Sequence, residues 1–197
     1  ECKEEFDESY AQDAEDKKTM GNSILIQTKE VNYNRPFEMP PWAHKFEEKG
    51  FHRAINVRGN FWWMEYGGEL DTIGDAEEIR DELIRIAYGV WNLAKNSRKK
   101  YAENVDLEWI GALPGKRENI RYVGDHILVQ KDIEAQGKFD DIVAYGGWPF
   151  DDHSPKAFYD KGAPTTFHNT PNPFGIPFRA LYSKNIENLY FAGRNIS

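Results

Sequence analysis

The feature that most constrains the fold is an apolar stripe at helical spacing near the middle of the chain. Its five residues are Ile79, Leu83, Ile86, Val90 and Leu93. Residues that recur every three or four positions lie on one face of a helix. Asp75 and Glu78 precede the stripe at the spacing of a capping box, and basic residues follow it up to Lys100, which suits the helix dipole. The pattern predicts one long amphipathic helix, about residues 75–100, with an apolar face that must be covered.

Short runs of β-branched and aromatic residues on either side of this helix predict strands. They cover residues 22–28, 54–57, 61–66, 107–112, 119–123, 127–130 and 142–145. We expect residues 31–33 to form a hairpin with the first run. We also expect the FWWMEY run at 61–66 to be covered on both faces, because its rings alternate onto both. The sequence thus predicts an α+β fold, an antiparallel or mixed β-sheet with the long helix packed on a face.

The chain after these strands is less regular. Residues 146–175 are rich in Pro, Gly, His and Asp and have no periodicity, so we expect a long loop, a kind of segment that is usually functional or disordered. Residues 176–197 end in an apolar run followed by Gly193, Arg194 and Asn195. A strand that ends at glycine lets a ligand approach the backbone, since glycine has no side chain in the way.

The composition argues against several classes of protein. A net charge of −8 at pH 7 argues against a general nucleic-acid binder and against binding to an anionic membrane. No run of about 18 apolar residues occurs, so we expect no membrane span. We expect a soluble protein, and the sequence leaves a cytoplasmic or periplasmic location open. One cysteine, Cys2, cannot form an internal disulfide or a zinc ribbon. Without H-E-x-x-H or paired Cys/His spacing, we expect no metal site.

Arginines are the candidates for binding an anionic ligand, because the usual phosphate-binding loops are absent. The chain has neither G-x-G-x-x-G nor G-x-x-x-x-G-K-[ST]. An arginine can hold a carboxylate or phosphate through two parallel hydrogen bonds. The alternative for each is a surface ion pair, for instance between Arg117 and Glu118. The candidates are Arg117, Arg121, Arg179 and Arg194.

The WPFDDH run at residues 148–153 is the candidate site for acid–base chemistry. His153 titrates near neutrality, which suits a general acid or base, and Asp151 could orient it. Its place in a loop favours a functional role. The alternative is a loop histidine bonded to the backbone. Trp148 could stack on a sugar or aromatic substrate, or simply pack against the protein.

Six blocks of the chain together resemble the FAD-dependent oxidoreductase family of glutathione-reductase-like flavoproteins. The blocks are TMGNSILIQ (19–27), WWMEYGGELDTIGDAEEIRDEL (62–83), YGVWNLAKN (88–96), LEWIGALPGKRENIRYVGDHILVQKDI (107–133), DDIVAYGGWPFDDH (140–153) and IPFRALYSKNIENLYFAGRNIS (176–197). They cover most of the chain in the family's order.

The resemblance implies a longer protein, in which an N-terminal Rossmann-type domain binds FAD. Residues 1–197 would then be a single substrate-side domain fragment that lacks this nucleotide-binding part. Residues 176–197 would return to the FAD-binding domain. We expect FAD in the full-length protein and not in this fragment, which we expect to be inactive alone. The implied partners are a small-molecule substrate and the N-terminal FAD-binding domain of the same protein.

The resemblance also implies roles for individual residues. The cofactor-binding residues would be Gly193, Arg194, Asn195 and Ser197. Related flavoproteins often place an Asp after this glycine to bind the ribityl chain. Here Arg194 takes that position, so the contact would run through the backbone or through Arg194 itself.

The catalytic residues that the resemblance implies come from two patterns. Arg117 and Arg121 match P-G-x-R-E-x-x-R, and Asp151 and His153 match W-P-x-D-x-H. We expect a hydride to pass between the flavin and an organic substrate, a carbohydrate or a small acid, with His153 as the base.

Arg117 and Arg121 would orient the substrate. Trp148 and Arg179 would help to bind it. A rival hypothesis from another class is a non-enzymatic carbohydrate-binding module with an aromatic-lined surface.

Overall fold

The computed structural model describes residues 2–3, 18–56, 61–97, 102–117, 120–163 and 165–197. The chain divides into two compact units. Residues 21–117 and 155–162 form one, which we call the helix unit. Residues 1–20, 118–154 and 163–197 form the other, which we call the ribbon unit. The single substrate-side domain over residues 1–197 stays a prediction.

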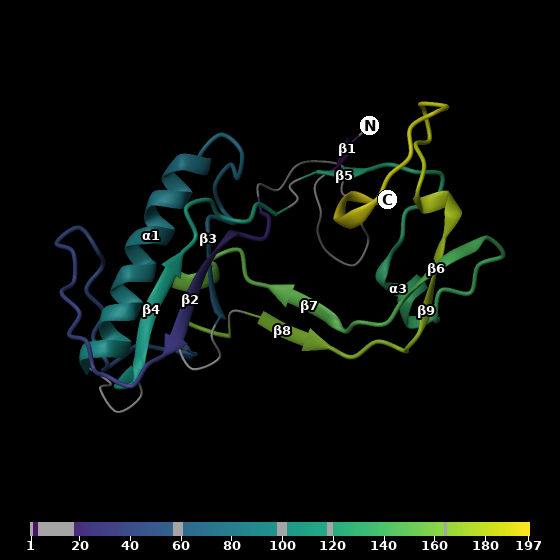
Figure 1. Ribbon diagram of the computed structural model, residues 1–197. Helices are drawn as coiled ribbons and strands as arrows, with labels where there is room; N and C mark the ends of the chain where they lie inside the picture. The colour runs from purple at the N-terminus through teal and green to yellow at the C-terminus, as the bar shows by residue number, and fades with distance from the viewer. Residues whose placement is uncertain (1, 4–17, 57–60, 98–101, 118–119, 164) are drawn as a thin grey trace. The chain divides into compact units, whose positions relative to one another are not determined.

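A three-stranded antiparallel sheet is the frame of the helix unit (Figure 1). The central strand β2 (Asn22–Glu30) pairs with β3 (Phe61–Tyr66) on one side and β4 (Val105–Ile110) on the other. Successive side chains of a strand point to opposite faces. One face of β2 is therefore buried and carries Asn22, Ile24, Ile26 and Thr28.

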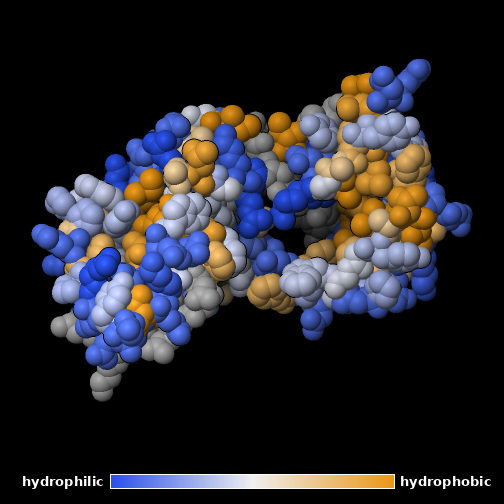
Figure 2. All heavy atoms as spheres, viewed as in Figure 1, coloured by the Kyte–Doolittle hydropathy of each residue, from blue (hydrophilic) through white to orange (hydrophobic). Residues whose placement is uncertain are grey.

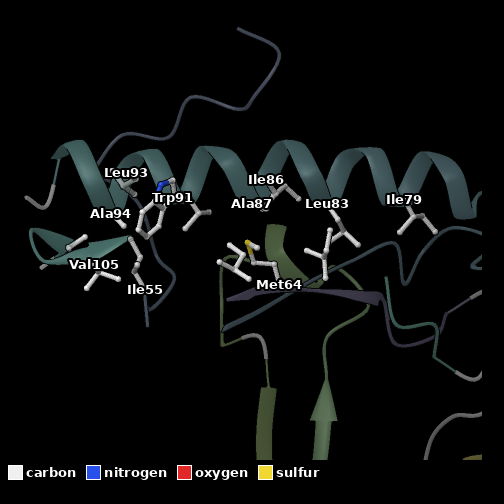
Figure 3. Close-up of a cluster of buried hydrophobic side chains, with 14 residues drawn as sticks. Ile55, Met64, Ile79, Leu83, Ile86, Ala87, Trp91, Leu93, Ala94 and Val105 are labelled. Carbon is white, nitrogen blue, oxygen red and sulfur yellow. The ribbon is translucent and has the colours of Figure 1, made fainter. Parts of the chain in front are cut away.

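Helix α1 (Ala76–Asn92) covers that buried face, and a π-helical turn, Leu93–Ser97, extends it. Figure 3 shows its apolar side chains pointing toward the sheet, where Met64 of β3 lies below them. All five residues of the predicted stripe are fully buried. Full burial of one such side chain contributes about 1.5–3 kcal/mol. The predicted α+β fold, with a long helix on one face of a sheet, is therefore confirmed, and the described strands all pair antiparallel.

The ends of this helix differ from the prediction. The capping box is wrong, because Asp75 makes no side-chain capping bond and its carboxylate instead accepts the amide of Asp71, 3.1 Å away. At the other end Lys95 is buried, and its Nζ donates to the carbonyls of Ala102 (3.0 Å) and Val105 (2.6 Å). Burial lowers the pKa of Lys95. Residues 98–100 of the predicted helix lie outside the described residues.

Several strand predictions are also wrong. Residues 54–56 and 127–129 are not strands, and Val129 instead caps the helix that begins at Gln130. The run 188–192 before Gly193 has only an isolated bridge at Tyr190. Residues 31–33 are not a strand, because β2 continues through Glu30 and the amide of Val31 bonds to the carbonyl of Asn104 (2.9 Å). The expected cover on both faces of β3 is missing, because α1 packs on one face only. Phe61 and Trp63, on the other face, are exposed.

Residues 155–162 belong to the helix unit although the strands beside them belong to the ribbon unit. The Arg53 guanidinium donates to four backbone carbonyls in this segment, those of Ala157, Phe158, Asp160 and Gly162. Tyr159 donates to Glu82 of α1 (Oη to Oε1, 2.6 Å), and burial together with this carboxylate raises the tyrosine's pKa. These bonds fix the segment onto the helix unit.

The ribbon unit has pairs of strands instead of a layered sheet. The pairs are β1 (Cys2–Lys3) with β5 (Arg121–Tyr122), β6 (Ile142–Gly146) with β9 (Phe174–Pro177), and β7 (Phe150–His153) with β8 (Thr165–His168). Its helices are short: α3 (Gln130–Glu134) and the 3-10 helices η3 (Phe178–Ala180) and η4 (Gly193–Asn195). The predicted unbroken loop at 146–175 is wrong, because β7 and β8 pair within it.

None of the helices in the described ranges is both long and apolar enough to cross a membrane.

Candidate functional site

The predicted cofactor segment begins with η4 in the ribbon unit. Gly193 has φ = +80°, a conformation that side chains rarely adopt, so glycine is required by the backbone. A Cβ built at Gly193 would meet no described atom within 4 Å. The backbone at this turn is therefore open to a ligand.

The last residue of the chain supplies a buried polar group. Ser197 is fully buried, and its Oγ has no hydrogen-bond partner among the described residues. Its amide donates to the carbonyl of Ala180 (3.1 Å), and Gly124 packs so closely that an added Cβ would lie 3.1 Å from the Cβ of Ser197. An unsatisfied buried hydroxyl costs about 1–3 kcal/mol. The Oγ of Thr19, also in the ribbon unit, is a second such group. Both hydroxyls can bond to a polar cofactor, so the residues present fit FAD.

Strand β5 lies against this cofactor segment. Asn195 donates through Nδ2 to the carbonyl of Ile120, directly before β5. Tyr122 of β5 stacks on Phe191, with ring centroids 4.8 Å apart and planes 21° apart. Arg121, a predicted catalytic residue, is half-buried on this strand. The structure therefore brings Arg121 together with the predicted cofactor-binding residues.

The remaining cofactor candidate, Arg194, is exposed. Its Nη2 lies 3.3 Å from the sulfur of Met20, close in sequence to the buried hydroxyl of Thr19. Arg194 is thus placed beside the segment that precedes β2.

The predicted acid–base pair lies on strand β7. Asp151 and His153 are two residues apart on the strand and share a face. Nε2 of His153 is 3.1 Å from Oδ2 of Asp151. The histidine side chain is 13% exposed and the aspartate 36%, so the ring is held by the carboxylate while remaining within reach of solvent. This geometry suits a histidine that a carboxylate orients for proton transfer.

Arg179 forms an ion pair with Asp141. Nε and Nη2 of Arg179 lie 3.0 and 3.1 Å from Oδ2 and Oδ1 of Asp141, and the Arg179 amide also donates to Oδ2 (3.0 Å). These bonds lower the pKa of Asp141 to about 2. Arg179 therefore forms a surface ion pair, the alternative that the sequence analysis left open. A substrate that bound Arg179 would have to compete with Asp141.

The two other predicted residues differ in their surroundings. Trp148 is 75% exposed, so it does not pack in a core, and its carbonyl accepts the hydroxyl of Thr170 (3.0 Å). Arg117 is half-buried in the helix unit, where its amide donates to Oδ1 of Asn22 (3.4 Å). Arg117 thus belongs to a different unit from the other predicted site residues.

Another histidine–carboxylate pair of the ribbon unit, His126 with Asp132, was not predicted. Nε2 of His126 lies 2.8 Å from Oδ2 of Asp132, which also accepts the amide of Val129 (3.2 Å). The His126 ring meets Phe139 edge to face, with centroids 5.0 Å apart. The His126 amide bonds to the carbonyl of Arg179, next to the residue that binds Ser197. A spacing of six residues has no helical period, and on a strand it would leave the two side chains about 20 Å apart, so no local pattern predicts this pair.

The comparisons with known proteins agree with the resemblance seen in the sequence. The model of one family, described as FAD dependent oxidoreductase, matches residues 3–197. No curated protein and no solved structure matches the chain. The family comparison covers nearly the whole chain and spans every candidate residue named above, so this chain belongs to the family of FAD dependent oxidoreductases.

Proposed function

We propose that this chain is the substrate-side part of an FAD-dependent oxidoreductase that completes its flavin site with an N-terminal FAD-binding domain of the same protein. The observation that carries the proposal is the pairing of an open backbone at Gly193 with the unpartnered buried hydroxyl of Ser197. Gly193, Arg194, Asn195 and Ser197 would hold the flavin. When bound, FAD supplies the hydride chemistry.

The exposed apolar surface of the ribbon unit supports a partner domain. Figure 2 shows hydrophobic residues gathered over β6, β9 and the segment that follows them. Exposed apolar and aromatic side chains of these segments are those of Val143, Tyr145, Phe178, Ile186 and Tyr190. Contiguous apolar surface marks an interaction site, and a two-stranded ribbon is marginally stable without a covering layer. We therefore assign this surface to the FAD-binding domain.

The Asp151–His153 pair would handle the proton that accompanies the hydride. With Nε2–H donating to Asp151, Nδ1 of the neutral imidazole would accept a proton from a substrate hydroxyl, and Asp151 would stabilise the cation that results. Arg121 would orient the substrate, and the same role for Arg117 stays a prediction, because Arg117 belongs to the helix unit. Trp148, with its exposed ring, would stack on it, and Arg179 would contribute when released from Asp141.

The substrate that these groups suit is a carbohydrate or a small acid. Arginines bind carboxylates and hydroxyls, and an exposed indole covers the apolar face of a sugar. We place the enzyme among glutathione-reductase-like flavoproteins and expect this chain to be inactive without the FAD-binding domain.

The cofactor assignment is tested by a matched pair of variants in the full-length protein. Gly193→Val should lose bound FAD, measured by its visible absorbance after purification. Gly50→Val is the control, because Gly50 also has a positive φ (+91°) and open space around it, but lies in the helix unit. Equal FAD content in the two variants would contradict the role of Gly193.

The proton role is tested by the rate of flavin reduction. His153→Ala should retain FAD but slow reduction by substrate about 10²–10⁴-fold and remove its pH dependence near neutrality. His168→Ala, an exposed histidine on the paired strand β8, is the control. If His153→Ala reduced its flavin at the same rates as the unaltered protein across pH, the assignment of His153 as the base would be wrong.

A further inference from the structure

The face of the helix unit's sheet that α1 does not cover carries exposed aromatic rings on both outer strands. Phe61 and Trp63 of β3 are 45% and 63% exposed, and Trp109 of β4 is 48% exposed. In the register of the sheet, Phe61 and Trp109 both lie opposite Gln27 of the central strand, and Trp63 lies opposite Leu25. The three rings therefore stand on one face and flank β2.

The arrangement of strands sets the spacing of these rings. Neighbouring strands lie about 4.8 Å apart, so β3 and β4 are separated by about 10 Å across β2. Aromatic side chains thus form the two edges of a flat strip whose middle is the outer face of β2. A short chain of linked sugar rings spans such a strip.

Polar side chains accompany the rings at the end of the strip that Phe61 and Trp109 mark, and apolar Leu25 lies opposite Trp63 at the other end. Glu108 accepts hydrogen bonds from Nε2 of Gln27 (3.0 Å) and from Nζ of Lys29 (3.3 Å). The side chains of Lys29 and Glu108 are 48% and 40% exposed. Gln27 thus lies between Phe61 and Trp109, whereas Lys29 and Glu108 lie beside these two rings, and all three polar groups are accessible to a ligand that covers them.

This combination decides the kind of ligand. An apolar protein surface seated on the strip would bury the Lys29–Glu108 pair without compensation, which is costly. A nucleic acid would meet a chain of net charge −8, which disfavours it. A neutral oligosaccharide fits both features, because the C–H face of each sugar packs on an aromatic ring while its hydroxyls bond to Gln27, Lys29 and Glu108.

We propose that the strip formed by Phe61, Trp63, Gln27, Lys29, Glu108 and Trp109 is a binding site for a neutral oligosaccharide chain. The site lies within the helix unit and does not depend on the flavin. It can hold a carbohydrate whether or not the redox assignment is correct.

The test is a titration of this chain with neutral hexasaccharides, namely gluco-, xylo- and manno-oligosaccharides with α and β linkages, followed by tryptophan fluorescence and calorimetry. We expect saturable binding to at least one of them. Trp63→Ala and Trp109→Ala should each weaken it about tenfold.

Trp42→Ala is the matched control, because Trp42 is a similarly exposed tryptophan (51%) of the same unit that packs on Tyr88 of α1. It should bind as the unaltered chain does. Circular dichroism checks that each variant is folded, and Trp63→Tyr, which keeps an aromatic ring, should retain most of the affinity.

Three outcomes overturn the proposal. They are no saturable binding to any neutral hexasaccharide, binding that Trp63→Ala and Trp109→Ala leave unchanged, and a concentration-dependent dimer that the same two variants abolish. The last result would make the strip an interface with a second copy. None of these outcomes bears on FAD content or flavin reduction, so failure here leaves the proposed function standing.

Discussion

The two units of this chain bury apolar residues in very different ways. The helix unit holds a continuous core, in which α1 lies on a three-stranded sheet and its stripe is fully buried. The ribbon unit has pairs of short strands and few buried apolar side chains among its described residues, namely Val123, Ala180 and Phe191. The first arrangement can sustain itself, whereas the second depends on specific polar contacts and close packing at a few points.

The difference matches the placement of the candidate site. All the predicted site residues except Arg117 lie in the ribbon unit, where the backbone at Gly193 is open and the buried hydroxyl of Ser197 has no partner among the described residues. Strands that bury little apolar surface gain from docking onto another domain. In the proposed function, the flavin site assembles where the ribbon unit meets the FAD-binding domain, and ligand sites are common between domains.

The largest expected effect comes from the core of the helix unit. Leu83→Ala should lower the free energy of unfolding by about 2–5 kcal/mol, because it leaves a cavity beneath a fully buried helix position. Val143→Ala is the matched substitution in the ribbon unit. Val143 is 56% exposed on β6, so the change should stay within about 0.5 kcal/mol. Urea denaturation measures both, and equal losses would remove the contrast between the units.

A smaller effect is expected when the pH is lowered, and it concerns the Asp141–Arg179 ion pair of the ribbon unit. The hydrogen bonds from Arg179 lower the pKa of Asp141 from 3.8 to about 2. A lowered carboxyl pKa means that the pair stabilises the fold above pH 3.8 and that this stabilisation is lost as the pH falls toward 2. In an NMR titration, Arg179→Gln should move the midpoint of Asp141 upward toward its ordinary value. An unchanged midpoint would show that Arg179 does not set this pKa in solution.

Sequence periodicity was sufficient to predict an element when the buried residues lie on one face of a single helix or strand. The stripe from Ile79 to Leu93 predicted α1 and its contact with a sheet, and both are present. Periodicity failed for β7 and β8, because strands with both faces largely exposed carry no alternation that could mark them. It also failed at β3, where rings on both faces suggested two covering layers and only one exists.

The sequence identified the residues of the candidate site, but it predicted few of the contacts that these residues make. The spacing of Asp151 and His153 is that of one strand face, and the two side chains do meet. The ion pair of Arg179 with Asp141 joins residues far apart in sequence, and no local pattern encodes such a pair. The burial of Ser197 depends in the same way on Gly124 and Ala180, which the fold alone brings to it.

The helix unit is held by its own core, and we propose that the ribbon unit relies on the FAD-binding domain. Hydrogen exchange of this chain and of the full-length protein tests it most directly, because amide protection reports local opening. We predict slow exchange in α1 and β2 of the chain alone, fast exchange in β6 and β9, and slow exchange of all four in the full-length protein. Equal protection of β6 and α1 in the chain alone, or no gain in β6 in the full-length protein, would contradict the claim.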